Sequence, residues 1–181
     1  MRVISGSARG TRLKPPKGTV VRPTSDRVKE SLFNILGNRV PGSTFIDLFA
    51  GSGAIGIEAL SRGSDHCIFI DNRRENILLI QDNLKKTRLV ERARLIKGNA
   101  DAIISRLNRE NIKADLIFLD PPYHSSDTVS LLQLIRASSL FHNNSLIIVE
   151  HSKNDLMWTE DFTPVKQNIY GQTCLTFIAK Q

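Results

Sequence analysis

Cysteine is scarce in this sequence, and so are long apolar runs. The two cysteines, Cys67 and Cys174, have neither metal-ligand nor redox spacing, so we expect buried free thiols rather than a disulfide. No segment provides the roughly 20 apolar residues of a membrane helix, and the arginine-bearing N-terminus lacks the apolar stretch of a secretory signal. The four histidines show no ligand spacing. We therefore expect a cytoplasmic protein without a membrane segment or a metal.

Acidic residues are rare in the first part of the chain. Residues 1–40 contain nine Lys or Arg against Asp26 and Glu30, a net charge of +7, whereas residues 41–181 contain 16 of each sign. The whole positive excess of this 181-residue protein therefore lies near its N-terminus. This distribution favours a polyanionic partner, because phosphate contacts supply affinity without requiring a particular base sequence. A solvated basic tail is the alternative.

The remaining elements follow from hydrophobic periodicity and turn residues. Glycines and prolines in residues 1–24 predict a short strand or hairpin and an extended arm, and a helix is expected from Asp26 to Leu36. Strands are then expected near 45–47, 67–71, 94–97, 115–119 and 146–150, with helices between them. This alternation predicts a Rossmann-like α/β fold with a mainly parallel sheet. Residues 165–170 and 173–179, joined by Gly171-Gln172, predict a C-terminal antiparallel hairpin.

The stretch FIDLFAGSGAIGIEAL, residues 45–60, reads as strand, glycine turn and helix. Gly51, Gly53 and Gly56 match the G-x-G-x-x-G pattern of nucleoside cofactor sites, including those for NAD. Asp47 favours a different ligand, because a carboxylate repels a pyrophosphate but attracts the ammonium and sulfonium of S-adenosylmethionine. We therefore assign Asp47, Phe49, Gly51 and Gly53 to a cofactor site. The alternative is that Asp47 only caps the helix.

Polar residues that end the predicted strands should meet at one edge of the sheet, where such folds bind ligands. Asp71 ends the second strand and is a candidate acceptor for the ribose hydroxyls. Asn99 or Asp101, with Ala100 between them, follows the third strand and is a candidate contact for adenine. A helix-capping role is the alternative for each of these polar side chains.

The string Asp120-Pro121-Pro122-Tyr123 follows the fourth strand. Its prolines stiffen the loop, so that the Asp120 carboxylate and the Pro121 carbonyl can act together as hydrogen-bond acceptors. Two acceptors can hold an exocyclic amino group in line with a methyl donor, and Tyr123 can stack on the base. We therefore assign Asp120, Pro121 and Tyr123 to catalysis. A rigid turn with a packed tyrosine is the alternative.

Three segments together resemble the RsmD family of bacterial 16S rRNA guanine-N2 methyltransferases. They are D-L-F-A-G-S-G (47–53), D-P-P-Y (120–123) and R-P-T-S-D-R-V-K-E-S-L-F-N-I-L (22–36). The resemblance implies a class I S-adenosylmethionine-dependent methyltransferase that modifies guanine N2 in 16S rRNA and releases S-adenosylhomocysteine. It places Asp47 and Gly51 at the methionine part of the cofactor, Asp71 at the ribose, and Asp120 with Tyr123 at the base. Relatives of this fold often have Asp where this chain has Asn99.

On the same basis we expect two regions in the chain. Residues 1–24 would form a small basic N-terminal β extension that contacts RNA, and residues 25–181 the methyltransferase domain. The arginines expected to contact RNA are Arg9, Arg12, Arg22 and Arg27. We expect a monomer that acts on 16S rRNA within an assembling 30S particle. The alternatives are an adenine-N6 or cytosine-N4 methyltransferase of DNA or other RNA, an NAD-dependent oxidoreductase, and a non-catalytic RNA-binding factor.

Overall fold

The computed structural model describes residues 1–16, 26–121, 125–154, 162 and 164–180, with the side chains of residues 125–127 excepted. The helices are α1 (Asp26–Leu36), α2 (Ala54–Ser61), α3 (Arg74–Thr87), α4 (Ala100–Arg109) and α5 (Ser125–Ala137), with 3₁₀ turns η1 (Gly37–Arg39) and η2 (Val90–Arg92). The strands are β1 (Thr44–Leu48), β2 (His66–Asp71), β3 (Ala93–Lys97), β4 (Ala114–Leu119), β5 (Phe141–Ser152), β6 (Lys166–Tyr170) and β7 (Thr173–Ala179).

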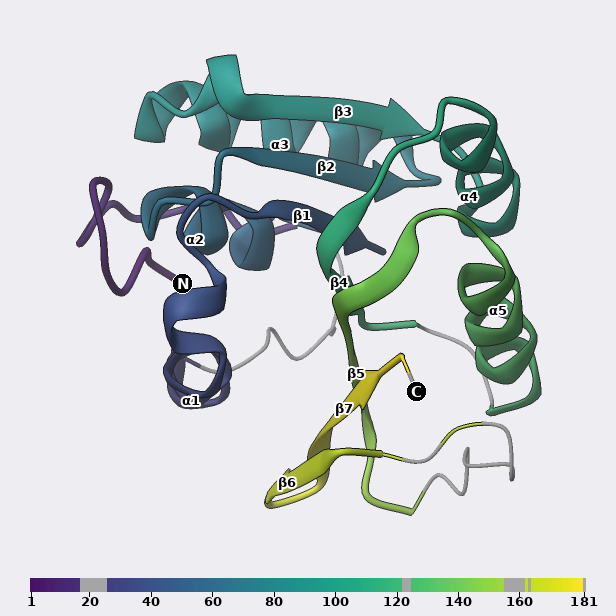
Figure 1. Ribbon diagram of the computed structural model, residues 1–181. Coiled ribbons are helices and arrows are strands. Elements are labelled where there is room, and N and C mark those ends of the chain that lie inside the picture. Colours follow the sequence, from purple (N-terminus) through teal and green to yellow (C-terminus); the bar gives the residue numbers. More distant parts are fainter. Residues whose placement is uncertain (17–25, 122–124, 155–161, 163, 181) are drawn as a thin grey trace.

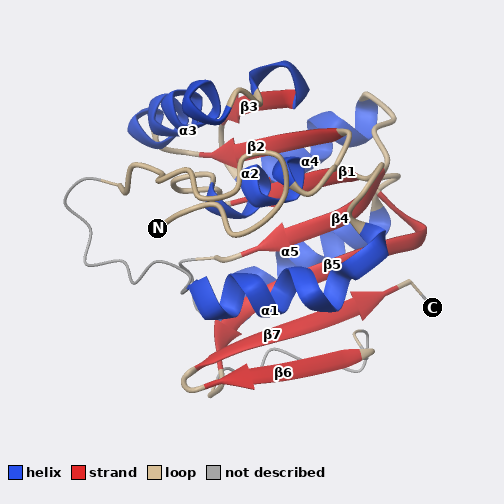
Figure 2. Ribbon diagram, turned by 90° about the vertical axis from the view of Figure 1, so that its left-hand side faces the viewer, coloured by secondary structure: helices blue, strands red, loops and turns tan. Residues whose placement is uncertain are grey.

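The strands form one twisted sheet in the order β3-β2-β1-β4-β5-β7-β6 (Figure 1). Strands β1 to β5 pair in parallel, and β7 runs antiparallel to both β5 and β6. In Figure 2, α1, α2 and α3 lie in front of the sheet, and α4 and α5 lie fainter behind it. The predicted α/β fold with a C-terminal antiparallel hairpin is therefore confirmed.

Strand β5 begins earlier than the sequence indicated. The expected strand covers 146–150, but the structure extends it from Phe141 to Ser152. The pairing of β5 with β4 is irregular near its start, and the Ser145 hydroxyl donates a hydrogen bond to the Ala114 carbonyl at 2.6 Å. Apolar periodicity missed this part because the residues between Phe141 and Ser145 are polar and partly exposed.

The sheet separates two apolar cores. On β1, Phe45 packs with the α1–α3 side, whereas Ile46 and Leu48 pack with the α4–α5 side. Helix α2 lies so close to the sheet that a Cβ on Gly56 would come within 2.3 Å of the Phe69 ring. The last glycine of the fingerprint therefore permits close packing of helix on strand. Within the described residues, no helix is both long and apolar enough to span a membrane.

Residues 1–14, called the N-terminal segment below, fold back on themselves and pack in front of α2 (Figure 2). An antiparallel bridge pairs Arg2 with Arg12. The side chains of Val3, Ala8 and Leu13 are buried in the core on the α1–α3 side. This segment therefore shares its apolar core with the sheet.

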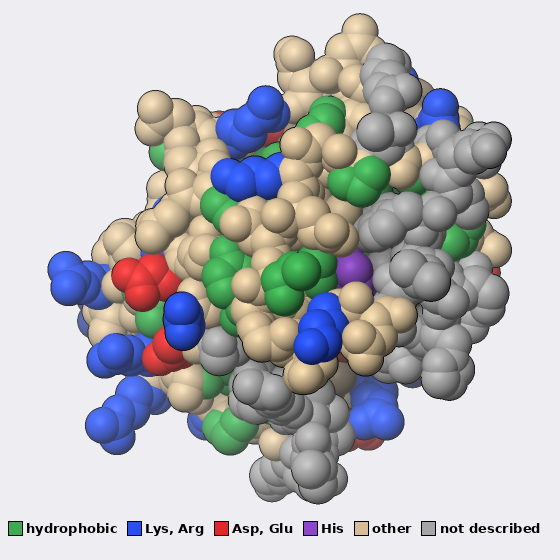
Figure 3. Space-filling model, turned by 90° about the horizontal axis from the view of Figure 1, so that it is seen from below, with side chains coloured by type: hydrophobic (Ala, Val, Ile, Leu, Met, Phe, Trp, Pro, Cys, Tyr) green, Lys and Arg blue, Asp and Glu red, His purple; other side chains and the backbone are tan. Residues whose placement is uncertain are grey.

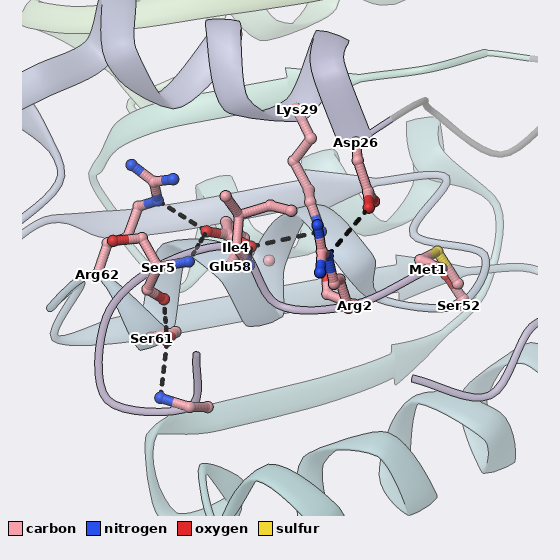
Figure 4. A network of polar contacts seen from close by, with 12 residues as sticks. Met1, Arg2, Ile4, Ser5, Asp26, Lys29, Ser52, Glu58, Ser61 and Arg62 are labelled. Carbon is pink, nitrogen blue, oxygen red and sulfur yellow. Dashed lines mark hydrogen bonds and ion pairs between the residues drawn. The ribbon is translucent and has the colours of Figure 1, made fainter. Parts of the chain in front are cut away.

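A buried carboxylate on α2 anchors the N-terminal segment (Figure 4). Glu58, fully buried, accepts hydrogen bonds from the backbone N–H groups of Ile4 at 2.8 Å and Ser5 at 3.0 Å. Its carboxylate also pairs with Lys29 Nζ of α1 at 3.3 Å and with Arg62 Nε at 2.8 Å. Burial lowers the pKa of Lys29, and the facing Glu58 carboxylate opposes that shift. One side chain thus joins α1, α2 and the N-terminal segment.

Replacement of Glu58 tests this anchor. Glu58→Ala leaves a buried ammonium and two backbone N–H groups without their acceptor, so the free energy of unfolding should fall by roughly 3–5 kcal/mol. Urea denaturation of the purified protein measures the loss. Glu110→Ala is the matched control, because Glu110 pairs with Arg94 and Arg106 at the surface and should change stability little. Equal stability of the two variants would contradict the anchoring role.

Candidate active site

The strand order reverses between β1 and β4, which is where open α/β sheets bind ligands at the carboxyl ends of their strands. Leu48 of β1 is in register with Ile70 of β2 on one side and with Leu119 of β4 on the other. The residues that follow, Phe49, Asp71 and Asp120, therefore leave the sheet side by side. Among the described residues, Phe49 and Asp71 of the predicted cofactor site and Asp120 of the predicted catalytic set thus lie at one edge of the sheet.

The glycine turn after β1 has an unusual backbone. Phe49, Gly51 and Gly53 all have positive φ, at 65°, 56° and 76°. Glycine adopts such angles freely, but a non-glycine residue there is strained, and such strain is concentrated at functional sites. The Ala50 N–H donates to the Ile70 carbonyl at 3.0 Å, which ties the turn to β2. The strained backbone of this turn therefore lies at the predicted cofactor site.

Asp71 supports the turn through its buried carboxylate. It accepts hydrogen bonds from the N–H of Gly51 at 2.9 Å, the N–H of Arg73 at 2.9 Å and the side-chain amide of Asn76 at 3.0 Å. An ionised carboxylate has about four acceptor positions, so capacity remains for a ribose hydroxyl. Asp71 therefore both fixes the turn and offers an acceptor beside it.

Asp47 lies beneath the turn, and its side chain is only 2% exposed. Its carboxylate accepts a hydrogen bond from the N–H of Gly56 in the first turn of α2 at 2.9 Å. Burial raises the pKa of Asp47 to about 7, and the nearby carboxylates Asp120 and Asp71 add to the increase, while the Gly56 bond opposes it. Asp47 therefore bonds the start of α2, and among the described contacts no cation offsets the charge of its ionised form.

Asp120 differs from Asp47 in being accessible. It follows β4 directly, and the residue is exposed. The neighbouring protein nevertheless desolvates its carboxylate enough to raise the pKa of Asp120 to about 6. Pro121 is next to it and half-buried, whereas Tyr123 lies outside the described residues. The carboxylate of Asp120 is therefore open to a substrate at the edge where the cofactor turn begins.

The candidate adenine contacts lie at the start of α4. Asn99 precedes the helix as its N-cap residue, but its exposed side chain makes no capping hydrogen bond. Asp101 is also exposed, and Ala100 is partly packed in the core on the α4–α5 side. The Gly98 N–H donates to the Asp71 carbonyl at 3.1 Å, which joins this loop to the ribose candidate. Both Asn99 and Asp101 remain available for a ligand.

Three of the four predicted RNA-contacting arginines are described, and all three are exposed. Arg9 and Arg12 are exposed on the N-terminal segment, and Arg27 is exposed on α1. Arg22 lies outside the described residues.

Sequence reasoning missed two asparagines of α3 that face the glycine turn. Asn76 binds Asp71, and Asn83 donates to the Ser52 carbonyl at 3.0 Å. They are seven residues apart, which places them on one helical face two turns apart. That spacing was available in the sequence, but it resembles a polar, solvated face.

Comparisons with known proteins find relatives along nearly the whole chain. The family model described as "Conserved hypothetical protein 95" matches residues 1–179. The chain is 39% identical over 183 residues to "Putative rRNA methyltransferase YlbH" of Bacillus subtilis, covering 100% of both chains. It is 33% identical over 174 residues to "Ribosomal RNA small subunit methyltransferase D" of Haemophilus influenzae, covering 94% of this chain and 89% of the relative.

A solved structure shows the similarity in three dimensions as well. The structure of yhhF from Escherichia coli superposes with a TM-score of 0.88 at 28% identity, covering 100% of this chain and 98% of the other. The chain therefore belongs to the family described as conserved hypothetical protein 95, and its resemblance to the RsmD methyltransferases is confirmed.

Proposed function

We propose that this protein transfers a methyl group from S-adenosylmethionine to the exocyclic N2 of a guanine in 16S rRNA. The observation that carries the proposal is the set of carboxylates at one edge of the sheet: Asp47 beneath the glycine turn, Asp71 beside it and Asp120 on the neighbouring strand. Relatives along nearly the whole chain are named as small-subunit rRNA methyltransferases.

The residues present fit the cofactor. The buried charge of Asp47 suits a ligand with a fixed positive charge, and the free acceptor capacity of Asp71 suits a ribose. Phe49, Gly51 and Gly53 would line the methionine part, and Asn99 with Ala100 the adenine. When bound, S-adenosylmethionine supplies an electrophilic methyl group.

The protein's part in the reaction is to position the amino group and to stabilise its developing charge. A guanine amine is a weak nucleophile, because its lone pair is delocalised into the ring. The Asp120 carboxylate and the Pro121 carbonyl would accept hydrogen bonds from its two N–H groups and so favour the pyramidal transition state. The raised pKa of Asp120 also makes it a suitable temporary acceptor for the proton that is lost. Tyr123 would stack on the base.

Recognition of the RNA falls to the basic end of the chain in this proposal. Residues 1–24 would form an RNA-binding extension of the methyltransferase domain, residues 25–181, with contacts from Arg9, Arg12, Arg22 and Arg27. On the face seen in Figure 3, the Lys and Arg side chains of the described residues are spread out rather than gathered in one patch. The proposal includes a monomer that acts in the cytoplasm on 16S rRNA within an assembling 30S particle.

Substitution of Asp120 tests the catalytic assignment. Asp120→Ala should lower the methyl-transfer rate by about 100-fold or more, because one of the acceptors of the amine is lost. Binding of S-adenosylhomocysteine should change by less than about threefold, since Asp120 lies on the substrate side of the site. Transfer of labelled methyl to small-subunit particles that lack the modification measures the rate, and calorimetry measures binding.

Asp115→Asn is the matched control for this test, because Asp115 lies at the opposite end of β4 and accepts a hydrogen bond from the Thr44 N–H at 2.8 Å. It should retain methyl transfer. Full activity of Asp120→Ala would rule out the acceptor mechanism, and mass spectrometry of the methylated nucleoside would show whether guanine N2 is the site.

The charge of Asp47 should oppose stability while favouring the cofactor. The pKa of Asp47 is about 7 in the folded protein, above the usual value of 3.8. Its contribution to stability is therefore greatest below pH 3.8 and is lost as the pH rises through about 7. Asp47→Asn keeps an acceptor for Gly56 and removes the charge. At about pH 8 it should therefore be more stable than wild type by on the order of 2–4 kcal/mol, with no such gain near pH 4.

The same variant should bind S-adenosylmethionine more weakly. Urea denaturation at the two pH values and calorimetry at the higher one measure the effects. Loss of stability at the higher pH together with unchanged cofactor affinity would show that Asp47 is only a structural cap.

A further inference from the structure

The side chain of Asn83 on α3 is fully buried, and both its amide nitrogen and its amide oxygen are hydrogen-bonded. Its amide nitrogen donates to the Ser52 carbonyl at 3.0 Å and to the Lys14 carbonyl at 3.1 Å, and its amide oxygen accepts from the Lys14 N–H at 2.8 Å. One side chain therefore joins the middle residue of the glycine turn to the end of the N-terminal segment.

The glycine turn depends on such contacts, because glycines give it little stiffness of their own. Two of its residues, Gly51 and Ser52, are hydrogen-bonded to side chains outside the turn. Asp71 accepts a hydrogen bond from the Gly51 N–H at 2.9 Å, and Asn83 of α3 donates one to the Ser52 carbonyl at 3.0 Å. Gly53 leaves room for the Ile80 side chain of α3, which a Cβ at that position would approach to 3.1 Å.

The N-terminal segment is itself firmly anchored, so it can act as a support. Its far end is held by Ser61, whose hydroxyl accepts the Ala8 N–H at 3.0 Å and donates to the Ser5 carbonyl at 2.6 Å. Near the turn, the Ser52 hydroxyl donates a long hydrogen bond to the Met1 sulfur at 3.5 Å. The segment thus extends along α2, from Ser61 at the C-terminal end of the helix to the glycine turn at the N-terminal end of the helix.

We propose that Asn83 is a positioning residue for the cofactor, which fixes the glycine turn by tying the Ser52 carbonyl to the anchored N-terminal segment. This inference rests on the proposed cofactor site, and it adds a second role to a segment otherwise assigned to RNA. Occupation of the turn by the cofactor and ordering of the segment then favour each other, since such coupling is reciprocal.

Asn83→Leu provides the first test. It preserves the size of the side chain but leaves the Ser52 carbonyl and both backbone groups of Lys14 without partners. The dissociation constant of S-adenosylhomocysteine, measured by calorimetry with the full-length protein, should increase by about tenfold or more. Thr87→Val is the matched control. It removes hydroxyl hydrogen bonds to two carbonyls of α3 one turn away, and affinity should stay within about twofold of wild type.

Ser61→Ala tests the role of the N-terminal segment. It loosens the far end of the segment without touching the glycine turn, and it should weaken S-adenosylhomocysteine binding by about two- to fivefold. Hydrogen exchange on the wild type provides a test that does not depend on the folding of a variant. Addition of S-adenosylhomocysteine should slow exchange in the peptide that contains Lys14 by about fivefold or more.

The outcomes separate the two proposals. If wild type did not bind S-adenosylhomocysteine, the proposed function would fail. If wild type bound it and Asn83→Leu bound it equally well, or if exchange in the Lys14 peptide did not change, the positioning role of Asn83 would be wrong.

Discussion

The site depends on the buried carboxylate of Asp47 and on the charge that it carries when ionised. Among the described residues, Gly56 donates the one hydrogen bond to the Asp47 carboxylate. Burial raises its pKa to about 7, and the nearby Asp120 and Asp71 carboxylates add to the increase. A core position filled in this way reduces the stability of the protein alone near neutral pH. A cationic ligand reverses the balance, because opposite charges attract strongly where water is excluded. In the proposed site, part of the affinity for the cofactor would come from relief of this unfavourable charge.

The same helices that shape the cofactor turn also hold the N-terminal segment. Helix α2 starts at the glycine turn, and its other end carries Glu58 and Ser61, which bind the segment. Helix α3 contributes Asn83, which binds both. A turn of glycines could otherwise sample many conformations at a cost to ligand affinity. Buried hydrogen bonds of this kind hold the backbone groups of the turn in one conformation. Apolar contacts alone cannot fix the direction of an N–H or a carbonyl group.

The sequence predicted the elements and the edge of the sheet where the site lies, because apolar periodicity and terminal polar residues are local signals. It did not predict which polar residues are buried. Lys29 and Asn83 occupy amphipathic helices where such side chains normally face water, and both are almost fully buried. Their burial depends on partners distant in sequence, namely Glu58 for the lysine and Lys14 for the asparagine. Local patterns cannot reveal such partners without a known tertiary structure.

Topology and exposure together explain how two similar carboxylates acquire different roles. Strands β1 and β4 are neighbours in register, so Asp47 near the end of one and Asp120 after the other lie close enough to raise the pKa of Asp47. Asp47 is sealed beneath the turn at 2% exposure, so it can act on a ligand only through its field. Asp120 is exposed, so its carboxylate can accept a hydrogen bond directly from a substrate. Carboxylates in different environments take different chemical tasks. The reversal of strand order brings the two together, and in the proposed mechanism this would place the methyl donor beside its acceptor.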